Sequence, residues 1–128
     1  AHVLLWDYSK PVQDVVNEEY YIRDLPARSL GNVTVSFSGL KPGKYSLERY
    51  RVGYLANDVY TLYLRAGLKE LEGRETPTAE QTAALAAYTN GAPESVETLA
   101  AGEDGCATLA VPLRENDVIR LILRRADV

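Results

Sequence analysis

Strict alternation of apolar and polar side chains over short segments is the feature that most constrains the fold of this chain. Residues 33–37 read Val-Thr-Val-Ser-Phe, and residues 107–113 and 119–123 also place an apolar side chain at every second position. Successive side chains of a strand point to opposite faces, so each segment predicts a β-strand with one apolar face. Short strands of this kind must bury those faces against one another. The sequence therefore predicts a mainly β fold, a β-sandwich of antiparallel strands.

Two consecutive strands are predicted to form a hairpin. Residues 40–43 read Leu-Lys-Pro-Gly, the composition of a tight turn, and they separate strand 33–37 from a second strand over residues 45–52. The alternation of the second strand changes phase after Leu47. A bulge near residues 48–49 would produce such a change of phase.

One or two short helices are predicted to interrupt the strands. Residues 57–67 have apolar side chains at helical spacing, with Asn57 as a cap and Gly67 as a stop, although their β-branched and aromatic content also fits a strand. A second helix is clearer. Pro77 is predicted at its first helical position, residues 78–81 form a capping box, and Asn90-Gly91 ends it.

The two ends of the chain predict further β structure around a long connection. Residues 2–8 form a nearly continuous apolar run, which predicts a strand covered on both faces with Trp6 in the core. Residues 9–31 show no clean period and are interpreted as a long loop. Pro112, within an alternating segment, predicts an edge strand or a bulge.

Length and composition predict a single globular domain over residues 1–128. The chain is 46% apolar and 25% charged, with a formal net charge of −4. Scattered basic residues argue against a nucleic-acid partner, and no apolar run approaches the roughly 20 residues that span a bilayer, so we expect a soluble protein. A single cysteine, Cys106, leaves the compartment open. The absence of methionine and the abrupt apolar start suggest a piece of a longer protein.

The residue types needed for catalysis or for a cofactor are nearly absent. His2 is the only histidine and Cys106 the only cysteine, too few for a catalytic triad or a zinc site, and we interpret both as structural. Asn17-Glu18 resembles the Asn-Glu pair that many barrel glycosidases carry at the end of a strand, but here it lies in the predicted loop over residues 9–31. Four acidic residues lack the spacing of a calcium loop: Asp14, Glu18, Glu19 and Asp24. We therefore predict no catalytic residue, no metal site and no cofactor.

Tyrosines in loops are the only weak candidates for ligand binding. Tyr20, Tyr21 and Tyr54 fall outside the predicted strands and helices. An exposed aromatic ring can stack on a sugar, and it can equally pack against a neighbouring domain. The sequence leaves both alternatives open.

Several segments, taken in order across nearly the whole chain, carry a resemblance to a known family. They are residues 3–8, 50–52, 57–60, 66–67, 76–81, 109–113 and 118–123. Together they resemble the β-sandwich that follows the catalytic barrel in family 39 glycoside hydrolases, the β-xylosidases.

The resemblance implies an accessory role. The catalytic glutamates of that family lie on a (β/α)8 barrel of about 250 residues, which a chain of 128 residues cannot contain. The implied partner is the barrel of the same parent chain, a retaining hydrolase of β-xylosides, and a homo-oligomer is left open. This hypothesis predicts an exposed apolar patch facing the barrel. The alternatives are a carbohydrate-binding module, which requires exposed aromatic rings, and an unrelated protein-interaction domain.

Overall fold

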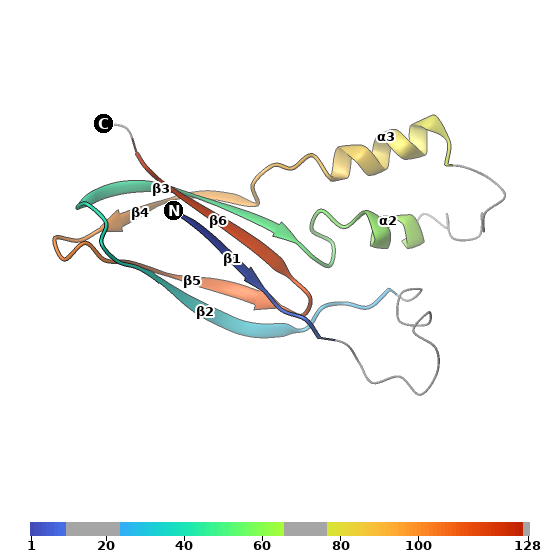
Figure 1. Cartoon of the computed structure of the whole chain (residues 1–128). Helices are drawn as coiled ribbons and strands as arrows, with labels where there is room; N and C mark the ends of the chain where they lie inside the picture. The colour runs from blue at the N-terminus through green and yellow to red at the C-terminus, as the bar shows by residue number, and fades with distance from the viewer. Residues whose placement is uncertain (10–23, 66–76, 127–128) are drawn as a thin grey trace.

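The chain folds into two facing antiparallel sheets, as a computed structural model of residues 1–9, 24–65 and 77–126 shows (Figure 1). The larger sheet has the strand order β1-β6-β3-β4, and the smaller sheet consists of β2 and β5. The strands are β1 (His2–Trp6), β2 (Ser29–Phe37), β3 (Gly43–Val52), β4 (Ser95–Ala101), β5 (Ala107–Arg114) and β6 (Val118–Arg125). This architecture confirms the predicted β-sandwich.

The apolar positions of the alternating segments form the core between the two sheets. Val111, Ile119 and Leu121 are fully buried, and Phe37 and Leu123 lie in the same cluster. Each of these side chains occupies the inward position that its segment predicted. The alternation therefore identified the inner faces of β2, β5 and β6 correctly.

The predicted hairpin is wrong. The strand containing residues 33–37 pairs with β5, whereas β3 pairs with β4 and β6 in the other sheet. The turn after Phe37 carries the chain between the sheets, and the Leu40 amide donates to the Gly105 carbonyl at 3.0 Å. Gly105 has a φ of +69°, and a side chain there would collide with the Leu40 carbonyl. Alternation requires only that a strand face the core, so it does not distinguish a hairpin from an arch between sheets.

The predicted bulge in β3 is also wrong. The pairing of β3 with β6 runs without interruption from Tyr45 opposite Arg125 to Val52 opposite Val118. The inward side chains are Tyr45, Leu47, Arg49 and Arg51. The alternation of inward and outward side chains therefore continues unchanged along β3. The sequence suggested a shift because Arg49 and Arg51 occupy inward positions while the apolar Val52 points outward.

The first strand is covered on one face only. Val3 and Leu5 pack against the core, whereas 65% of the Trp6 surface is exposed. Both the two-sided burial and the core placement of Trp6 were therefore wrong. The physical reason is that no described element packs on the outer face of β1, where Leu4 and Trp6 lie.

Two helices lie together beyond one end of the sheets (Figure 1). The first, α2 (Val59–Arg65), confirms the helical alternative for that segment, but Asp58 caps it rather than Asn57. The Thr61 amide donates to the Asp58 carboxylate at 3.0 Å. Gly67, its predicted stop, lies outside the described residues.

The second helix, α3 (Ala79–Tyr88), has the predicted capping box. The Gln81 amide donates to the Thr78 hydroxyl at 3.2 Å, and the Thr78 amide donates to the Gln81 side chain at 2.8 Å. Pro77 precedes this cap, so it does not take the first helical position as predicted. In the described part of the chain, no helix is long and apolar enough to span a membrane.

Two strand assignments were incomplete. The sequence interpretation omitted β4, and it began β2 at Val33, although the strand starts at Ser29 inside the predicted loop over residues 9–31. Residues 10–23 of that loop lie outside the described residues. Pro112 lies on β5, which pairs with β2 alone among the described strands, so its predicted edge position is confirmed.

Candidate functional site

A row of exposed apolar side chains crosses three strands of the larger sheet. Trp6 on β1 is opposite Val118 on β6, and Val118 is opposite Val52 on β3. Directly opposite residues of antiparallel strands share one face of the sheet. The exposed fractions are 65% for Trp6, 40% for Val118 and 53% for Val52. We call these three residues the apolar row.

Polar groups border the apolar row on the same face. In the next register position Leu4 is opposite Arg120, and Arg120 is opposite Tyr50. The Tyr50 hydroxyl donates to the Glu48 carboxylate at 2.8 Å, and this hydrogen bond raises the pKa of Tyr50. The Arg120 guanidinium lies 3.2 Å from the His2 ring. The margin of the apolar row is therefore mixed, with the exposed Leu4 beside the polar groups of Arg120 and Tyr50.

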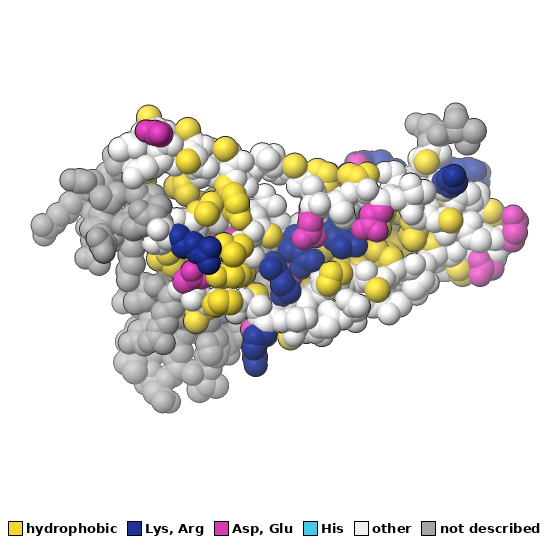
Figure 2. Space-filling model, turned by 180° about the vertical axis from the view of Figure 1, so that it is seen from behind, with side chains coloured by type: hydrophobic (Ala, Val, Ile, Leu, Met, Phe, Trp, Pro, Cys, Tyr) yellow, Lys and Arg dark blue, Asp and Glu magenta, His cyan; other side chains and the backbone are white. Residues whose placement is uncertain are grey.

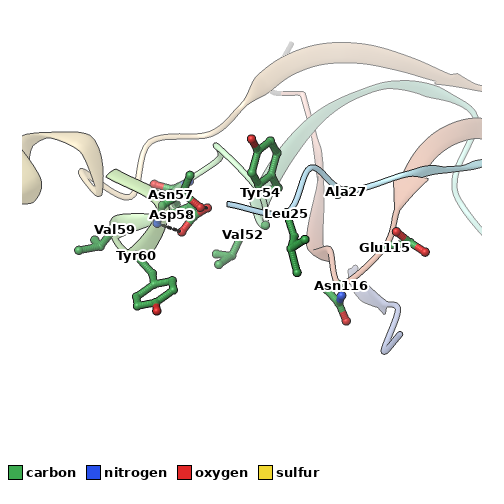
Figure 3. A pocket seen from close by; sticks show the side chains of 12 residues that line it. Leu25, Ala27, Val52, Tyr54, Asn57, Asp58, Val59, Tyr60, Glu115 and Asn116 are labelled. Carbon is green, nitrogen blue, oxygen red and sulfur yellow. Dashed lines mark hydrogen bonds between the residues drawn. The ribbon is translucent and has the colours of Figure 1, made fainter. Parts of the chain in front are cut away.

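An open pocket of about 410 Å³ adjoins the apolar row at the helical end of the molecule (Figure 3). Val52 belongs to both features. The other lining residues come from the segment before β2, the turn after β3, α2 and the turn before β6: Leu25, Ala27, Gly53, Tyr54, Asn57, Asp58, Val59, Tyr60, Thr61, Glu115 and Asn116. Most of the side chains labelled in Figure 3 that approach Val52 are apolar or aromatic.

Tyr54 is joined to two charged groups at the pocket. Its hydroxyl donates to Asp24 at 2.6 Å and accepts from Arg65 at 2.9 Å, while Arg65 donates to Asp24 at 2.9 Å. The hydrogen bond from Tyr54 lowers the pKa of Asp24, with Arg65 adding to the effect, and the same carboxylate raises the pKa of Tyr54. Tyr54 is half-buried and its hydroxyl is hydrogen-bonded to Asp24 and Arg65, so it does not offer an exposed ring on which a sugar could stack. Tyr20 and Tyr21 lie outside the described residues.

The two pocket carboxylates from other elements also have partners. Asp58 caps α2, and Glu115 accepts two hydrogen bonds from the Arg28 side chain, at 2.8 and 2.5 Å. The Arg28 guanidinium lowers the pKa of Glu115. Tyr60, 45% exposed, lies nearly parallel to Tyr63 with ring centroids 6.4 Å apart. The pocket therefore offers apolar surface more than unsatisfied polar groups.

A buried charge network lies directly beneath the apolar row. Asp117 is completely buried and accepts hydrogen bonds from Arg51 and Arg114, and Arg51 also donates to Glu94 at 2.9 Å. A side chain at Gly53 would overlap the Asp117 carboxylate. Arg51 and Asp117 immediately precede Val52 and Val118 in the chain, so this network fixes two positions of the row. This network was not predicted, because nothing in the alternation of the strands marks Arg51 and Asp117 as partners.

The remaining sequence candidates do not form a site. Cys106 is exposed in the turn before β5, and His2 is exposed at the start of β1. Of the four acidic residues weighed for calcium, only Asp24 falls within the described residues, where it is bound to Tyr54 and Arg65. Across residues 1–9, 24–65 and 77–126, no group of three or more His, Cys, Asp or Glu is placed to hold a metal ion.

One face of the molecule shows how apolar and charged side chains are distributed around the sheets. In Figure 2 hydrophobic side chains gather toward the helical end and continue as a broken strip along the length of the molecule. Lys, Arg, Asp and Glu side chains interrupt that strip near its middle. The helical end is therefore the more apolar part of this face.

Comparison with solved structures relates the whole chain to one part of larger enzymes. A GH39 enzyme from Xanthomonas axonopodis pv. citri matches with a TM-score of 0.83 and 30% identity over 98% of this chain. A monomeric β-xylosidase from Caulobacter crescentus CB15 matches with a TM-score of 0.82 and 31% identity, also over 98%. The chain spans 24% of each of these enzymes. No family model and no curated protein matches. The resemblance to a small domain of family 39 glycoside hydrolases is confirmed.

Proposed function

We propose that this chain is a non-catalytic accessory domain of a β-xylosidase-like, retaining glycoside hydrolase, and that it supports the catalytic barrel of its parent chain. The observation that carries the proposal is the match of 98% of this chain to 24% of a GH39 enzyme and of a β-xylosidase. A match of this kind is what a domain joined to a larger catalytic part produces. The names of the two neighbours, a GH39 enzyme and a β-xylosidase, support the activity and substrate class that we propose for the parent chain.

The apolar row supplies a surface for docking on the barrel. Exposed apolar area is costly in water, and contiguous patches with an aromatic anchor are typical of interfaces. Trp6 has the size and exposure of such an anchor. We place the partner within the same chain, because one neighbour that contains this fold is described as monomeric. A homo-oligomer is the alternative that the experiments below separate.

The pocket supports a non-catalytic role for the chain. Glycoside hydrolysis requires two carboxyl groups on opposite sides of the glycosidic bond. The pocket carboxylates Asp58 and Glu115 instead cap a helix and pair with Arg28. Their engagement favours a structural task for both.

Activity measurements test the proposal directly. The isolated chain and the full-length product of its gene would be assayed with an aryl β-xyloside, with empty-vector preparations as the control. We expect hydrolysis by the full-length protein and none by the isolated chain. Hydrolysis by the isolated chain would contradict the proposal, and so would a full-length protein that contains no barrel.

A carbohydrate-binding module is the second candidate, favoured by the exposure of Trp6 and Tyr8, 65% and 78%. Titration of the ¹⁵N-labelled chain with xylobiose and longer xylo-oligosaccharides separates the two functions. The accessory role predicts an unchanged spectrum, including the indole resonance of Trp6. Localised, saturable shifts around Trp6 and Tyr8 would replace the accessory role by sugar binding.

A further inference from the structure

We propose that the free edge of β1 receives an extended segment from the rest of the parent chain, which adds a fifth strand to the larger sheet. The inference rests on the proposed function, because that function supplies the additional polypeptide. It goes beyond docking of the apolar row, because it concerns backbone pairing at an edge rather than side-chain contact on a face. It also specifies the conformation of the partner segment.

The hydrogen bonds of β1 identify which of its backbone groups have no backbone partner among residues 1–9, 24–65 and 77–126. Ala1 exchanges hydrogen bonds with Leu123, at 2.7 and 2.9 Å, and the Asp7 amide donates to Asp117 at 3.0 Å. Pairing groups alternate along a strand, so Val3 and Leu5 also face β6. The amides and carbonyls of His2, Leu4 and Trp6 therefore point to the free edge.

The other sheet edges carry features that discourage pairing. On β5, Pro112 lacks an amide hydrogen, and its carbonyl accepts from Arg51 at 3.0 Å. The register of β2 shifts between Ser29 and Gly31. On β4, the inward Glu97 is paired with Arg49. Proline, irregular register and inward charges are the devices by which natural sheets block edge-to-edge pairing.

The β1 edge has none of these devices. His2–Trp6 contains no proline, glycine or acidic residue, and its five register pairs with β6 are continuous. Leu4 and Trp6 add exposed apolar side chains, 55% and 65% exposed, to that regular edge. A flat, apolar and unprotected edge strand promotes aggregation unless another strand covers it. The edge of β1, the only one of these edges without such a feature, is thus on the strand that carries Trp6 of the apolar row.

The occupant is identified by what lies outside this chain and by the chemistry of the edge. Three quarters of each neighbouring enzyme lies beyond the matched part, and one of these enzymes is monomeric, so the segment is intramolecular. Residues of the added strand beside Leu4 and Trp6 would meet an apolar outer face. Those beside Val3 and Leu5 would extend the core. An uncharged strand with β-branched or aromatic residues fits both faces.

Amide exchange of two adjacent leucines tests this inference with an internal control. With ¹⁵N-leucine labelling, the isolated chain should show fast exchange at Leu4, which faces the edge, and slow exchange at Leu5, which pairs with β6. In the full-length protein we expect Leu4 exchange to slow by about 100-fold or more, with Leu5 little changed. Unchanged exchange at Leu4 in a full-length protein that contains an active barrel would overturn the inference while leaving the proposed function intact. Protection of Leu4 in the isolated chain that grows with concentration would replace the intramolecular segment by a second copy.

A proline substitution provides an independent test. Leu4→Pro removes an amide that faces the edge and leaves the β1–β6 hydrogen bonds in place, whereas the matched variant Leu4→Thr keeps that amide. We expect the two isolated variants to melt within a few degrees of each other. In the full-length protein Leu4→Pro should melt clearly below Leu4→Thr. Equal melting temperatures of the two full-length variants would contradict strand addition.

Discussion

The two outward faces of the sandwich differ in kind, although both belong to strands with the same alternation. Apart from the apolar Leu30 and Pro112, most outward side chains of the smaller sheet are polar or small: Asn32, Thr34, Ser36, Thr108 and Ala110. Ser36 and Thr108 lie opposite one another, with their hydroxyl oxygens 3.3 Å apart. On the larger sheet the corresponding face carries the apolar row of Trp6, Val118 and Val52.

The contrast is the one expected if the smaller sheet faces water and the larger sheet faces the partner that we propose. Inward positions of both sheets obey one requirement, burial in a shared core, and they are mainly apolar, with two charge pairs among them, Arg51–Asp117 and Arg49–Glu97. Outward positions depend on the surroundings of each sheet. Hydroxyl and amide side chains form hydrogen bonds with water. The exposed indole and valine side chains are largely apolar, so covering them with another surface lowers the free energy.

The largest expected effect comes from removing the buried support of the apolar row. Asp117→Ala would leave the Arg51 guanidinium buried without its main charge partner, so we expect the free energy of unfolding to fall by about 3–5 kcal/mol. Chemical denaturation of the isolated chain measures this change. Glu103→Ala, at an exposed acidic residue of the turn before β5, is the matched control and should change stability by less than about 0.5 kcal/mol. Similar effects for the two variants would show that the buried network does not support the row.

A smaller effect is expected from making the apolar row polar. The double variant Trp6→Thr, Val118→Thr should leave the isolated chain within about 0.5 kcal/mol of the wild type, because both side chains are exposed there. In the full-length protein the same change should weaken docking by about 2 kcal/mol or more. Differential scanning calorimetry of both forms measures the difference.

The polar face provides the control for that experiment. Ser36→Ala and Thr108→Ala on the smaller sheet should be nearly neutral in the isolated chain and in the full-length protein. A loss of stability that is the same in both forms for the Trp6 and Val118 variant would contradict an interdomain role of the apolar row. It would assign those side chains to folding of the domain itself.

The smallest effect is expected from acid at the pocket beside the apolar row. Hydrogen bonds and charge from Tyr54 and Arg65 lower the pKa of Asp24, and Arg28 does the same for Glu115. Lowered pKa values mean that these contacts contribute fully above the ordinary values of 3.8 and 4.5, and that their contribution is lost as the pH falls through the lower, folded-state values. Amide resonances around Tyr54 and Arg28 should therefore shift below pH 4, ahead of those of Thr34. A simultaneous change at all three positions would instead indicate global unfolding.

The sequence predicted correctly which side chains of each strand face the core, but not which strands pair with one another. Phe37, Val111 and Leu121 were placed inside because alternation records which face of a strand meets the core. The same signal could not choose between a hairpin and an arch, so β2 and β3 were paired wrongly. The helix cap at Thr78 was predicted correctly, since capping depends on residues close in the chain.

The candidate site was the least predictable part, for a physical reason. Trp6 was assigned to the core because a nearly continuous apolar run suggests burial on both faces. Its exposure depends on which layers cover the sheet, and no described element packs on the outer face of β1. The pairing of Arg51 with Asp117 joins residues far apart in the chain and follows no local pattern. The resemblance to family 39 enzymes added what local patterns lacked, the expectation of an absent partner.

Radical footprinting of Trp6 tests the central claim most directly. Hydroxyl-radical labelling followed by mass spectrometry would compare the isolated chain with the full-length protein, using Leu30 on β2, which is exposed away from the apolar row, as an internal reference. If the apolar row is the interdomain surface, Trp6 is labelled rapidly in the isolated chain and is strongly protected in the full-length protein, while Leu30 is labelled equally in both. Equal labelling of Trp6 in the two forms would contradict the account.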